Sequence, residues 1–219
     1  MINFSNLIDQ HLKRELKQKT IGRYYPSEVG GCLRKTWYSY KYPKEVDKEL
    51  LKIFQVGEML HDFLAEVLRS DKTQDVRLIE SEFPFKMDMD DFTISGRVDD
   101  ILIVEKDGKK VLVEVKSVKM IEMVDEPQFS HEMQIQLYMN ATGIHDGLLV
   151  YVEKSSLQIK QFEIKYDKGI VNYVIERFRN LHKHLIENTL PSPEAKQRDD
   201  MKWMCKRCEY KEMCDRSEK

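Results

Sequence analysis

Cysteine, long apolar runs and net charge are all scarce in this sequence of 219 residues. No apolar run approaches the about 18 residues that a membrane span requires, and the amphipathic N-terminus, MINFSNLIDQHLKRELK, contains no apolar signal-peptide segment. We therefore expect a cytoplasmic protein whose thiols stay reduced. The formal net charge of -2 gives no overall attraction to nucleic acid, so any DNA binding would depend on local patches.

The four cysteines are unevenly distributed. Cys32 lies in SEVGGCLRKTWY near the N-terminus, and Cys205, Cys208 and Cys214 lie together in MCKRCEYKEMC at the other end. In a reducing compartment such clustered cysteines are more typical of metal ligands than of disulfides. Four thiolates can hold a zinc ion or an iron–sulfur cluster, and their spacing alone excludes neither.

The composition, 41% hydrophobic and 34% charged, suits one domain with a substantial core. We divide it into a helical N-terminal part at about residues 1–70, a core at about 71–190 and a cysteine-bearing tail at about 191–219. Periodicity predicts an α/β fold, in which helices flank a central mixed sheet. The predicted helices are 2–19, a short helix capped by Ser27, 48–69, 125–142 and 167–187, and the strands are 76–85, 92–105, 109–117, 147–154 and 156–166.

The strand VLVEVKS carries charges in an apolar setting. Alternation places Glu114 and Lys116 on one face and the flanking valines on the other. Such a strand is expected to be buried, where unpaired charges are costly. The preceding strand brings Asp99 and Asp100 alongside, and oxygen donors from two strands suit Mg²⁺ or Mn²⁺, with a lysine to activate water. The alternative is a surface ion pair on an edge strand.

Four motifs together resemble the PD-(D/E)XK nuclease superfamily in its RecB-like branch. GRVD ending at Asp99 matches G-x-x-D, and EVK matches E-x-K. QIQLY, from Gln134 to Tyr138, matches Q-x-x-x-Y, and GEMLH, ending at His61, matches G-x-x-x-H. The resemblance implies a restriction-endonuclease-like core, and it selects Asp99 where alternation leaves Asp99 and Asp100 open.

The same resemblance implies roles for these residues. It assigns the divalent ion to His61, Asp99, Glu114 and the backbone carbonyl of Val115. An imidazole ligand favours Mn²⁺ over Mg²⁺. Lys116 would activate water, and Gln134 and Tyr138, which share a helix face, would hold Lys116 or the DNA backbone near the ion. The alternatives are a solvated or packed His61, a Tyr138 in the core and a Gln134 that caps a sheet edge.

The cysteine arrangement is similar to that of RecB-like nucleases with a 4Fe-4S cluster, and it implies that Cys32, Cys205, Cys208 and Cys214 hold such a cluster. A small chain with one nuclease domain looks most like the CRISPR-associated Cas-four exonucleases. That resemblance implies cleavage of single-stranded DNA from an end, 5′-to-3′, and delivery of fragments to the integrase of the CRISPR adaptation complex.

Two further expectations concern nucleic acid. Arg34 and Lys35, beside Cys32, are predicted to contact DNA, with Trp37 and Tyr38 available to stack on bases. The alternative for these cations is a solvated helix face. Two other functions stay open: a stand-alone viral or repair nuclease outside CRISPR, and a non-catalytic, zinc-bound nucleic-acid-binding module in which the carboxylates are structural.

Overall fold

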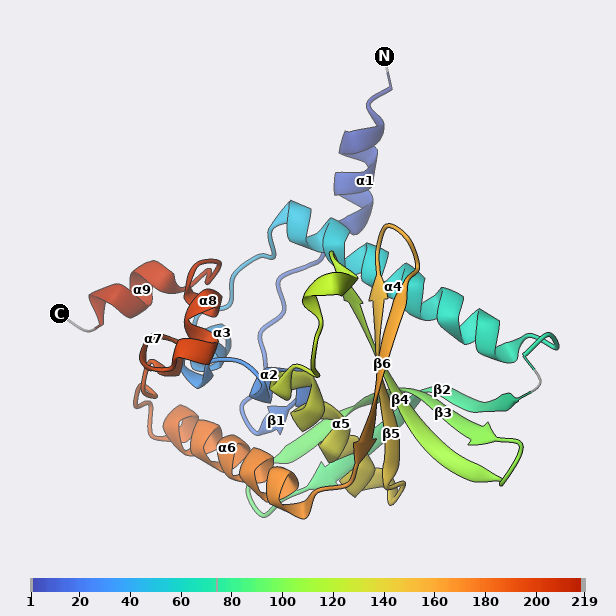
Figure 1. Ribbon diagram of the computed structural model, residues 1–219. Coiled ribbons are helices and arrows are strands. Elements are labelled where there is room, and N and C mark those ends of the chain that lie inside the picture. Colours follow the sequence, from blue (N-terminus) through green and yellow to red (C-terminus); the bar gives the residue numbers. More distant parts are fainter. Residues whose placement is uncertain (1, 74, 218–219) are drawn as a thin grey trace.

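Six strands form one mixed sheet at the centre of the computed structural model, which describes residues 2–73 and 75–217 (Figure 1). The strands are β1 (Arg23–Tyr24), β2 (Val76–Asp88), β3 (Thr93–Val104), β4 (Lys109–Val118), β5 (Asp146–Glu153) and β6 (Ile159–Lys165). Their order is β1-β3-β4-β5-β6, with β2 also paired to β3. The β1–β3 and β4–β5 pairs are parallel and the others antiparallel. The predicted α/β class with a mixed sheet is confirmed.

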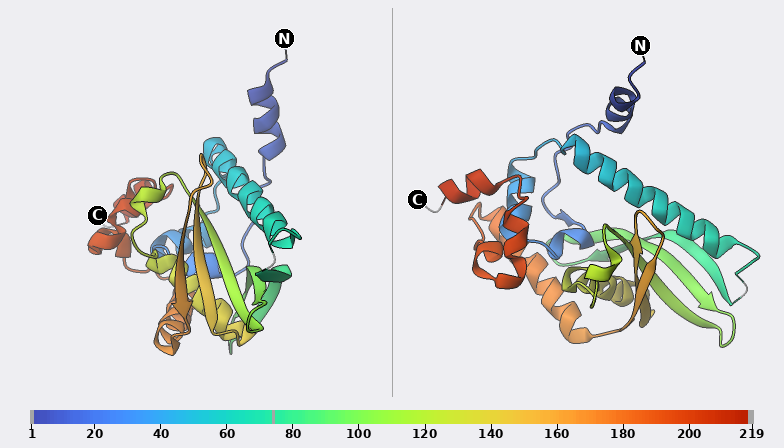
Figure 2. Two further views of the ribbon diagram at one scale, coloured as in Figure 1. Left: turned by 45° about the vertical axis from the view of Figure 1, so that its right-hand side comes forward. Right: turned by 45° about the horizontal axis from the view of Figure 1, so that its top comes forward.

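Helices cover both faces of this sheet (Figure 2). The longer ones are α1 (Phe4–Leu12), α3 (Leu33–Lys41), α4 (Lys48–Arg69), α5 (Phe129–Thr142) and α6 (Lys168–Ile186). The short ones are α2 (Pro26–Val29), α7 (Glu194–Gln197), α8 (Lys202–Cys205), α9 (Lys211–Arg216) and the 3-10 turns η1 (Ile121–Met123) and η2 (Asp199–Met201). None of the helices within the described ranges is long and apolar enough to cross a membrane.

Two apolar clusters fix the helices to the sheet. On one face, Leu60 of α4 packs with Val113 and Val115 of β4. On the other, α3, α5 and α6 bury a larger cluster that includes Leu112 of β4 and Phe178 of α6. Because neighbouring residues of β4 belong to different clusters, the strand is buried on both faces, as its apolar sequence predicted.

Capping residues explain why several helices begin or end where the sequence indicated. Helix α4 has the predicted bounds, and the Asp47 carboxylate accepts the backbone N–H groups of its first turn. Asp167 caps α6 in the same way. At Gly143 the backbone adopts φ 71°, the left-handed conformation that commonly ends a helix, and this closes α5.

Three predicted helices have different bounds in the structure. The helix predicted at 2–19 ends at Leu12, since none of its residues is buried and a short helix without packing is marginal. The helix predicted from Ser27 is divided into α2 and α3 at Gly30 and Gly31, and Tyr25 is the N-cap of α2. The helix predicted at 125–142 begins only at Phe129, because Pro127 disfavours helical geometry before it.

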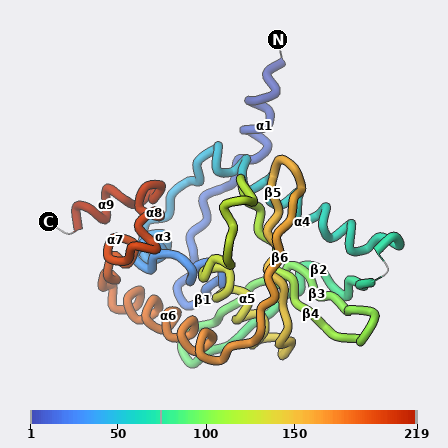
Figure 3. Tube along the Cα trace, viewed as in Figure 1, coloured from blue at the N-terminus to red at the C-terminus, as the bar shows by residue number. Residues whose placement is uncertain are grey.

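Although the two termini themselves lie apart, the C-terminal segment α7–α9 lies next to α3 of the N-terminal part (Figure 3). The buried guanidinium of Arg177 on α6 links them. It donates to the carbonyls of Val29 (3.1 Å) and Gly31 (2.9 Å) and forms an ion pair with Glu194 (2.7 Å). Glu194 also accepts the backbone N–H of Leu33 at 2.9 Å. One ion pair therefore joins α6, the start of α3 and the C-terminal tail.

Two adjacent glycines provide a test of the packing between α2 and α5. A Cβ on Gly30 would lie 2.5 Å from the Cβ and 3.0 Å from the Cα of Ser130, whereas one on Gly31 would meet nothing within 4 Å. We expect Gly30→Ala to lower the free energy of unfolding in urea by about 1–3 kcal/mol, because the backbone of α5 must shift. Gly31→Ala should change it by less than about 0.5 kcal/mol. Equal effects would contradict this close approach.

Candidate active site

Strands β3 and β4 separate at the predicted site. Their pairing runs from Val104 opposite Lys109 to Asp100 opposite Val113, and the next residues along the two strands are Asp99 and Glu114. Two carboxylates directly opposite each other would destabilise an antiparallel pair. Instead, Asp99 Oδ2 accepts the backbone N–H of Val115 at 2.8 Å. A side chain thus takes the place of the sheet hydrogen bond, and a gap opens between the strands.

Glu114 is the most buried carboxylate at this gap, with 1% of its surface exposed. Its Oε1 accepts a hydrogen bond from the Lys116 ammonium, while its Oε2 has no hydrogen-bond partner among the described residues. Burial raises the pKa of Glu114 to about 8, and the charge of Asp99 adds to this rise. A buried carboxylate oxygen without a partner is a feature that a bound cation would explain.

Lys116 lies on the same face of β4 as Glu114 and is held from α5. Its Nζ donates to Gln134 Oε1 at 3.2 Å, and Gln134 Nε2 donates to the Tyr138 hydroxyl at 2.6 Å. Burial alone would lower the pKa of Lys116, but Glu114 and Asp99 more than offset it and raise the pKa above its ordinary value. The side chain is therefore an ammonium at neutral pH. Gln134 and Tyr138, on one face of α5, orient it.

His61 reaches the gap from α4. Its Nδ1 lies 3.5 Å from Asp99 Oδ2, and the two side chains are 31% and 15% exposed. Burial raises the pKa of Asp99, against the opposing effect of His61 and Lys116. Two carboxylates and an imidazole suit Mn²⁺ or Mg²⁺, yet within residues 2–73 and 75–217 no three such side chains are already close enough to hold an ion. The donor types fit a divalent ion that would draw them together.

Asp100, the alternative to Asp99, has a different environment. It is 3% exposed and hydrogen bonds with Ser81, while its Oδ1 has no partner in the described part of the chain. Burial raises its pKa. The 3.5 Å contact with His61 and the hydrogen bond across the gap belong to Asp99.

Glu82 is a neighbour of Asp99 that the sequence analysis did not identify as part of the site. It lies on β2 between Ser81, which pairs with Asp100, and Phe83, which pairs with Val98. Its φ of 56° is unusual for a residue other than glycine. The negative charge of Glu82 also raises the pKa of Asp99, although this effect is smaller than those of burial and of the neighbouring cations. An acidic residue in ESEF is ordinary for an exposed strand, so no sequence signal marked it.

Comparison with known proteins identifies the family. The sequence matches the PD-(D/E)XK nuclease superfamily over residues 7–215. The chain belongs to this superfamily. No curated protein sequence matches it significantly.

Several solved structures share this nuclease fold. The crystal structure of SSO0001 aligns with a TM-score of 0.61 and 22% identity, covering 94% of this chain and 90% of that one. LHK-Exo from Laribacter hongkongensis, in complex with dAMP, aligns with a TM-score of 0.55 and 14% identity, covering 77% of this chain and 90% of that one. A phage related exonuclease from Haemophilus somnus 129PT aligns with a TM-score of 0.55 and 13% identity, covering 85% of this chain and 99% of that one. At these identities the likeness concerns the fold.

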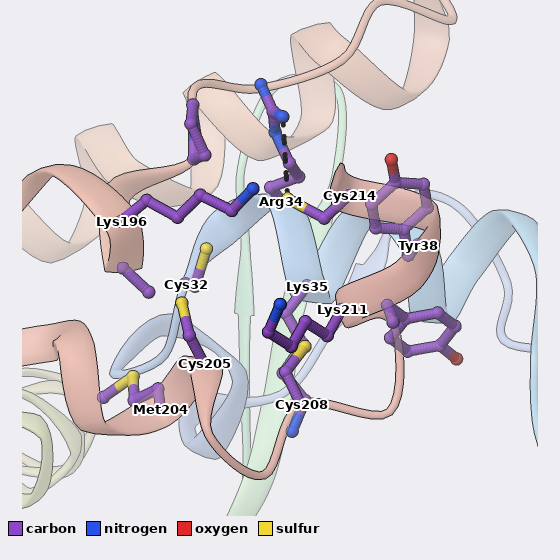
Figure 4. Close-up of a pocket in the computed structure, with 13 residues that line it drawn as sticks. Cys32, Arg34, Lys35, Tyr38, Lys196, Met204, Cys205, Cys208, Lys211 and Cys214 are labelled. Atoms are coloured by element: carbon purple, nitrogen blue, oxygen red, sulfur yellow. Dashed lines mark hydrogen bonds between the residues drawn. The ribbon is translucent and has the colours of Figure 1, made fainter. Parts of the chain in front are cut away.

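The four cysteines of this nuclease lie around one pocket (Figure 4). All four are free thiols, and they come from the start of α3, the end of α8, the following turn and α9. Burial raises the pKa of the Cys205 and Cys208 thiols. In the described ranges the thiols do not yet form a set close enough to hold a metal. The donor set fits either a zinc ion or an iron–sulfur cluster.

The residues predicted to contact DNA beside Cys32 are more buried than expected. Arg34 is 8% exposed, and its guanidinium donates to Pro191 O at 2.6 Å and to Cys214 Sγ at 3.7 Å. Lys35 is half-buried, with 44% of its side chain exposed, and pairs with Glu209 at 3.1 Å. Trp37 and Tyr38 are 6% and 4% exposed and pack in the core, so the expectation that their rings stack on bases was wrong. Burial also leaves Arg34 little surface to offer DNA.

The raised pKa of Glu114 predicts a pH-dependent effect on stability. The folded protein keeps a proton on Glu114 up to about pH 8, whereas the unfolded chain releases it near its ordinary pKa of 4.5, so stability falls as the pH rises through this window. In EDTA, the free energy of unfolding of Glu114→Gln, minus that of the wild type, should be about 3.5 kcal/mol more positive at pH 8 than at pH 5. Denaturant titrations at both pH values measure this difference.

Glu163→Gln provides the control, since Glu163 is an exposed carboxylate on β6. It should change the free energy of unfolding by less than about 0.5 kcal/mol at either pH. If Glu114→Gln did not increase the free energy of unfolding at pH 8, burial would not disfavour the ionised form of Glu114.

Proposed function

We propose that this PD-(D/E)XK nuclease is a metal-dependent DNA exonuclease that cleaves single-stranded DNA from an end, with a structural iron–sulfur cluster. The observation that carries the proposal is the convergence of His61, Asp99, Glu114 and Lys116 where β3 and β4 separate. A surface ion pair on an edge strand does not account for a buried carboxylate with a free oxygen on a strand that has neighbours on both sides.

Each residue of the site has a distinct role in the proposed hydrolysis of the phosphodiester. A bound Mn²⁺ or Mg²⁺, held by His61, Asp99, Glu114 and the carbonyl of Val115, would polarise the phosphodiester and lower the pKa of a water molecule. Lys116, as an ammonium, donates hydrogen bonds that orient the attacking water and offset negative charge on the phosphate. Gln134 and Tyr138 hold Lys116 in this direction. The water oxygen then forms the new P–O bond and releases a proton to solvent, while the bond from phosphorus to the leaving oxygen breaks and that oxygen takes up a proton from solvent.

Two kinds of observation support an exonuclease acting on DNA ends. Structures of similar fold include proteins named as exonucleases, one of them with bound dAMP. The motifs resemble those of the Cas-four family, from which we propose 5′-to-3′ polarity, a cytoplasmic location and delivery of fragments to the integrase of the CRISPR adaptation complex. A stand-alone viral or repair nuclease would use the same residues, because nothing in the site depends on such a partner.

The iron–sulfur cluster is proposed from the donor set. Cys32, Cys205, Cys208 and Cys214 line the pocket together with Lys35 and Lys211, whose charges would offset those of thiolates. Cys32 comes from the N-terminal part and the other three from the tail, so ligand bonds would restrict the unfolded chain over nearly its whole length. Its role would be structural.

End-labelled single-stranded DNA provides the test of the reaction. With Mn²⁺ or Mg²⁺ the protein should shorten the DNA progressively from one end, and EDTA should stop it. Labels at the 5′ and 3′ ends, in separate reactions, distinguish the polarity. A protein that binds DNA but cleaves none under any of these conditions would favour the non-catalytic module.

Single substitutions test the site itself. Asp99→Ala and Glu114→Ala should each reduce the cleavage rate at least about 100-fold, because each removes a charged ligand of the ion. Asp100→Asn is the matched control on the same strand. Burial already disfavours the charged form of Asp100, so a neutral amide should lower the rate less than about fivefold. Full activity in both alanine variants would contradict the assignment.

The cysteine pocket gives a separate prediction. Cys32→Ser should remove bound iron and colour as completely as Cys208→Ser, because a four-thiolate cluster needs ligands from both chain ends and an alcohol is a poor substitute. The short tail, of which only a few side chains are buried, should then become the first site of proteolysis. Metal analysis after anaerobic purification and limited proteolysis measure both effects.

Met204→Leu is the control for the pocket, since Met204 lines it without a thiolate. It should keep full iron content and a resistant tail. Stoichiometric zinc in the colourless wild-type protein would replace the iron–sulfur assignment with a zinc site, whereas iron retained in Cys32→Ser would exclude a four-cysteine cluster.

A further inference from the structure

A groove lies on the sheet near the active site, and residues of β1, β2, β3 and the start of α2 line it. Arg23, Tyr25, Lys86 and Arg97 line it, and we call it the basic groove. Its volume is about 840 Å³, which is within the range of pockets that hold nucleotide-sized ligands.

The separation of β3 and β4 places this groove beside the catalytic residues. Strand β1 pairs with β3 at Thr93 and Ile94, and β4 pairs with the same strand only from Asp100 onward. Between these pairings, in the described structure, residues 95–99 of β3 lie opposite neither strand. Gly96 and Arg97 line the groove, and Asp99 follows two residues later.

Tyr138 makes a second connection from the groove to the active site. It lines the groove, and its hydroxyl accepts the Gln134 amide that also holds Lys116. A chain lying in the groove would therefore pass next to the residues that position the ammonium.

The charge of the groove suits a polyanion. Among the described residues that line it, three are basic and none is acidic. Lys86 and Arg97 do pair with Asp88 (2.7 Å) and Glu82 (3.2 Å), but all four side chains are more than half exposed. Such exposed pairs contribute little to stability, so phosphates can replace the carboxylates at low cost. By contrast, the groove beside α1 carries acidic residues among its basic ones.

Tyr25 adds an aromatic surface to these cations. The ring belongs to a residue that is 38% exposed, and the Arg23 guanidinium lies 5.8 Å from its centroid. Basic side chains that follow a phosphate backbone, together with a ring on which a base can stack, are typical of sites for single-stranded nucleic acid.

We propose that the basic groove binds the single-stranded DNA substrate and leads its backbone to Asp99, with Arg23 and Lys86 on phosphates and Tyr25 against a base. This inference rests on the proposed function and adds the path of the substrate. It places DNA recognition at β1 and β2, in a groove that shares no lining residue with the cysteine pocket where Arg34 and Lys35 lie.

Binding of a fluorescent single-stranded oligonucleotide in EDTA, followed by anisotropy over a range of salt concentrations, tests the groove without cleavage. Arg23→Gln/Lys86→Gln should weaken binding at least about 10-fold and reduce the slope of log K against log salt by about 1.4, since each lost phosphate contact accounts for about 0.7. Tyr25→Leu should weaken binding about fivefold or more and leave the slope unchanged, because stacking releases no counterions. Arg97 stays unchanged because its partner Glu82 lies near Asp99.

The matched control is Arg179→Gln/Lys183→Gln, which removes the same charge from a groove beside α6 that also contains Asp90, Asp91 and Glu187. It should keep the wild-type affinity within twofold and the same salt slope. A wild-type protein that neither binds nor cleaves single-stranded DNA would contradict the proposed function and this inference together. Wild-type binding and cleavage that survive Arg23→Gln/Lys86→Gln, with an unchanged slope, would overturn the groove alone.

Discussion

The active site depends on two acidic residues that cannot continue an antiparallel ladder. Asp99 and Glu114 are the next residues after the last pair of β3 and β4. The strands separate there, Asp99 accepts the Val115 N–H, and direct pairing of the two carboxylates is avoided. The separation has two consequences. It leaves a buried gap in which oxygen donors face an ammonium, and it exposes the part of β3 beside which the basic groove lies.

A second constraint holds the chain ends against this core. Arg177 and Glu194 are both largely buried, and each satisfies the other while also hydrogen bonding to backbone near Cys32. Removing one partner of such a pair would leave an uncompensated charge, so the ion pair fixes the tail beside α3 in addition to the apolar contacts of Ala195, Met201 and Tyr210. The cysteines are thereby brought to one pocket without a disulfide.

Sequence alone predicted the elements that periodicity and capping determine. Helix α4 and the presence of strands β2 to β6 along the chain follow from apolar spacing and from residues such as Asp47 and Gly143. Strand and helix periods also predicted that Glu114 shares a face with Lys116 and that Gln134 shares one with Tyr138. That the two faces meet was implied by the family resemblance and not by the periods. Burial of Arg34, Trp37 and Tyr38 was missed, since it depends on a tail more than a hundred and fifty residues away. Glu82 was missed because its backbone conformation, not its residue type, marks it.

A net charge of -2 conceals how charge is arranged in this molecule. Three acidic residues of the site, Asp99, Asp100 and Glu114, lie where burial makes their ionised forms costly, as their raised pKa values indicate. The nearby groove carries the opposite sign. In this arrangement a bound divalent ion would lower the cost of the buried carboxylates, and the basic groove would offset the charge of phosphates that those carboxylates repel. The ion and the basic groove would thus together allow an acidic site to accept a polyanion, although the chain as a whole carries a small negative net charge.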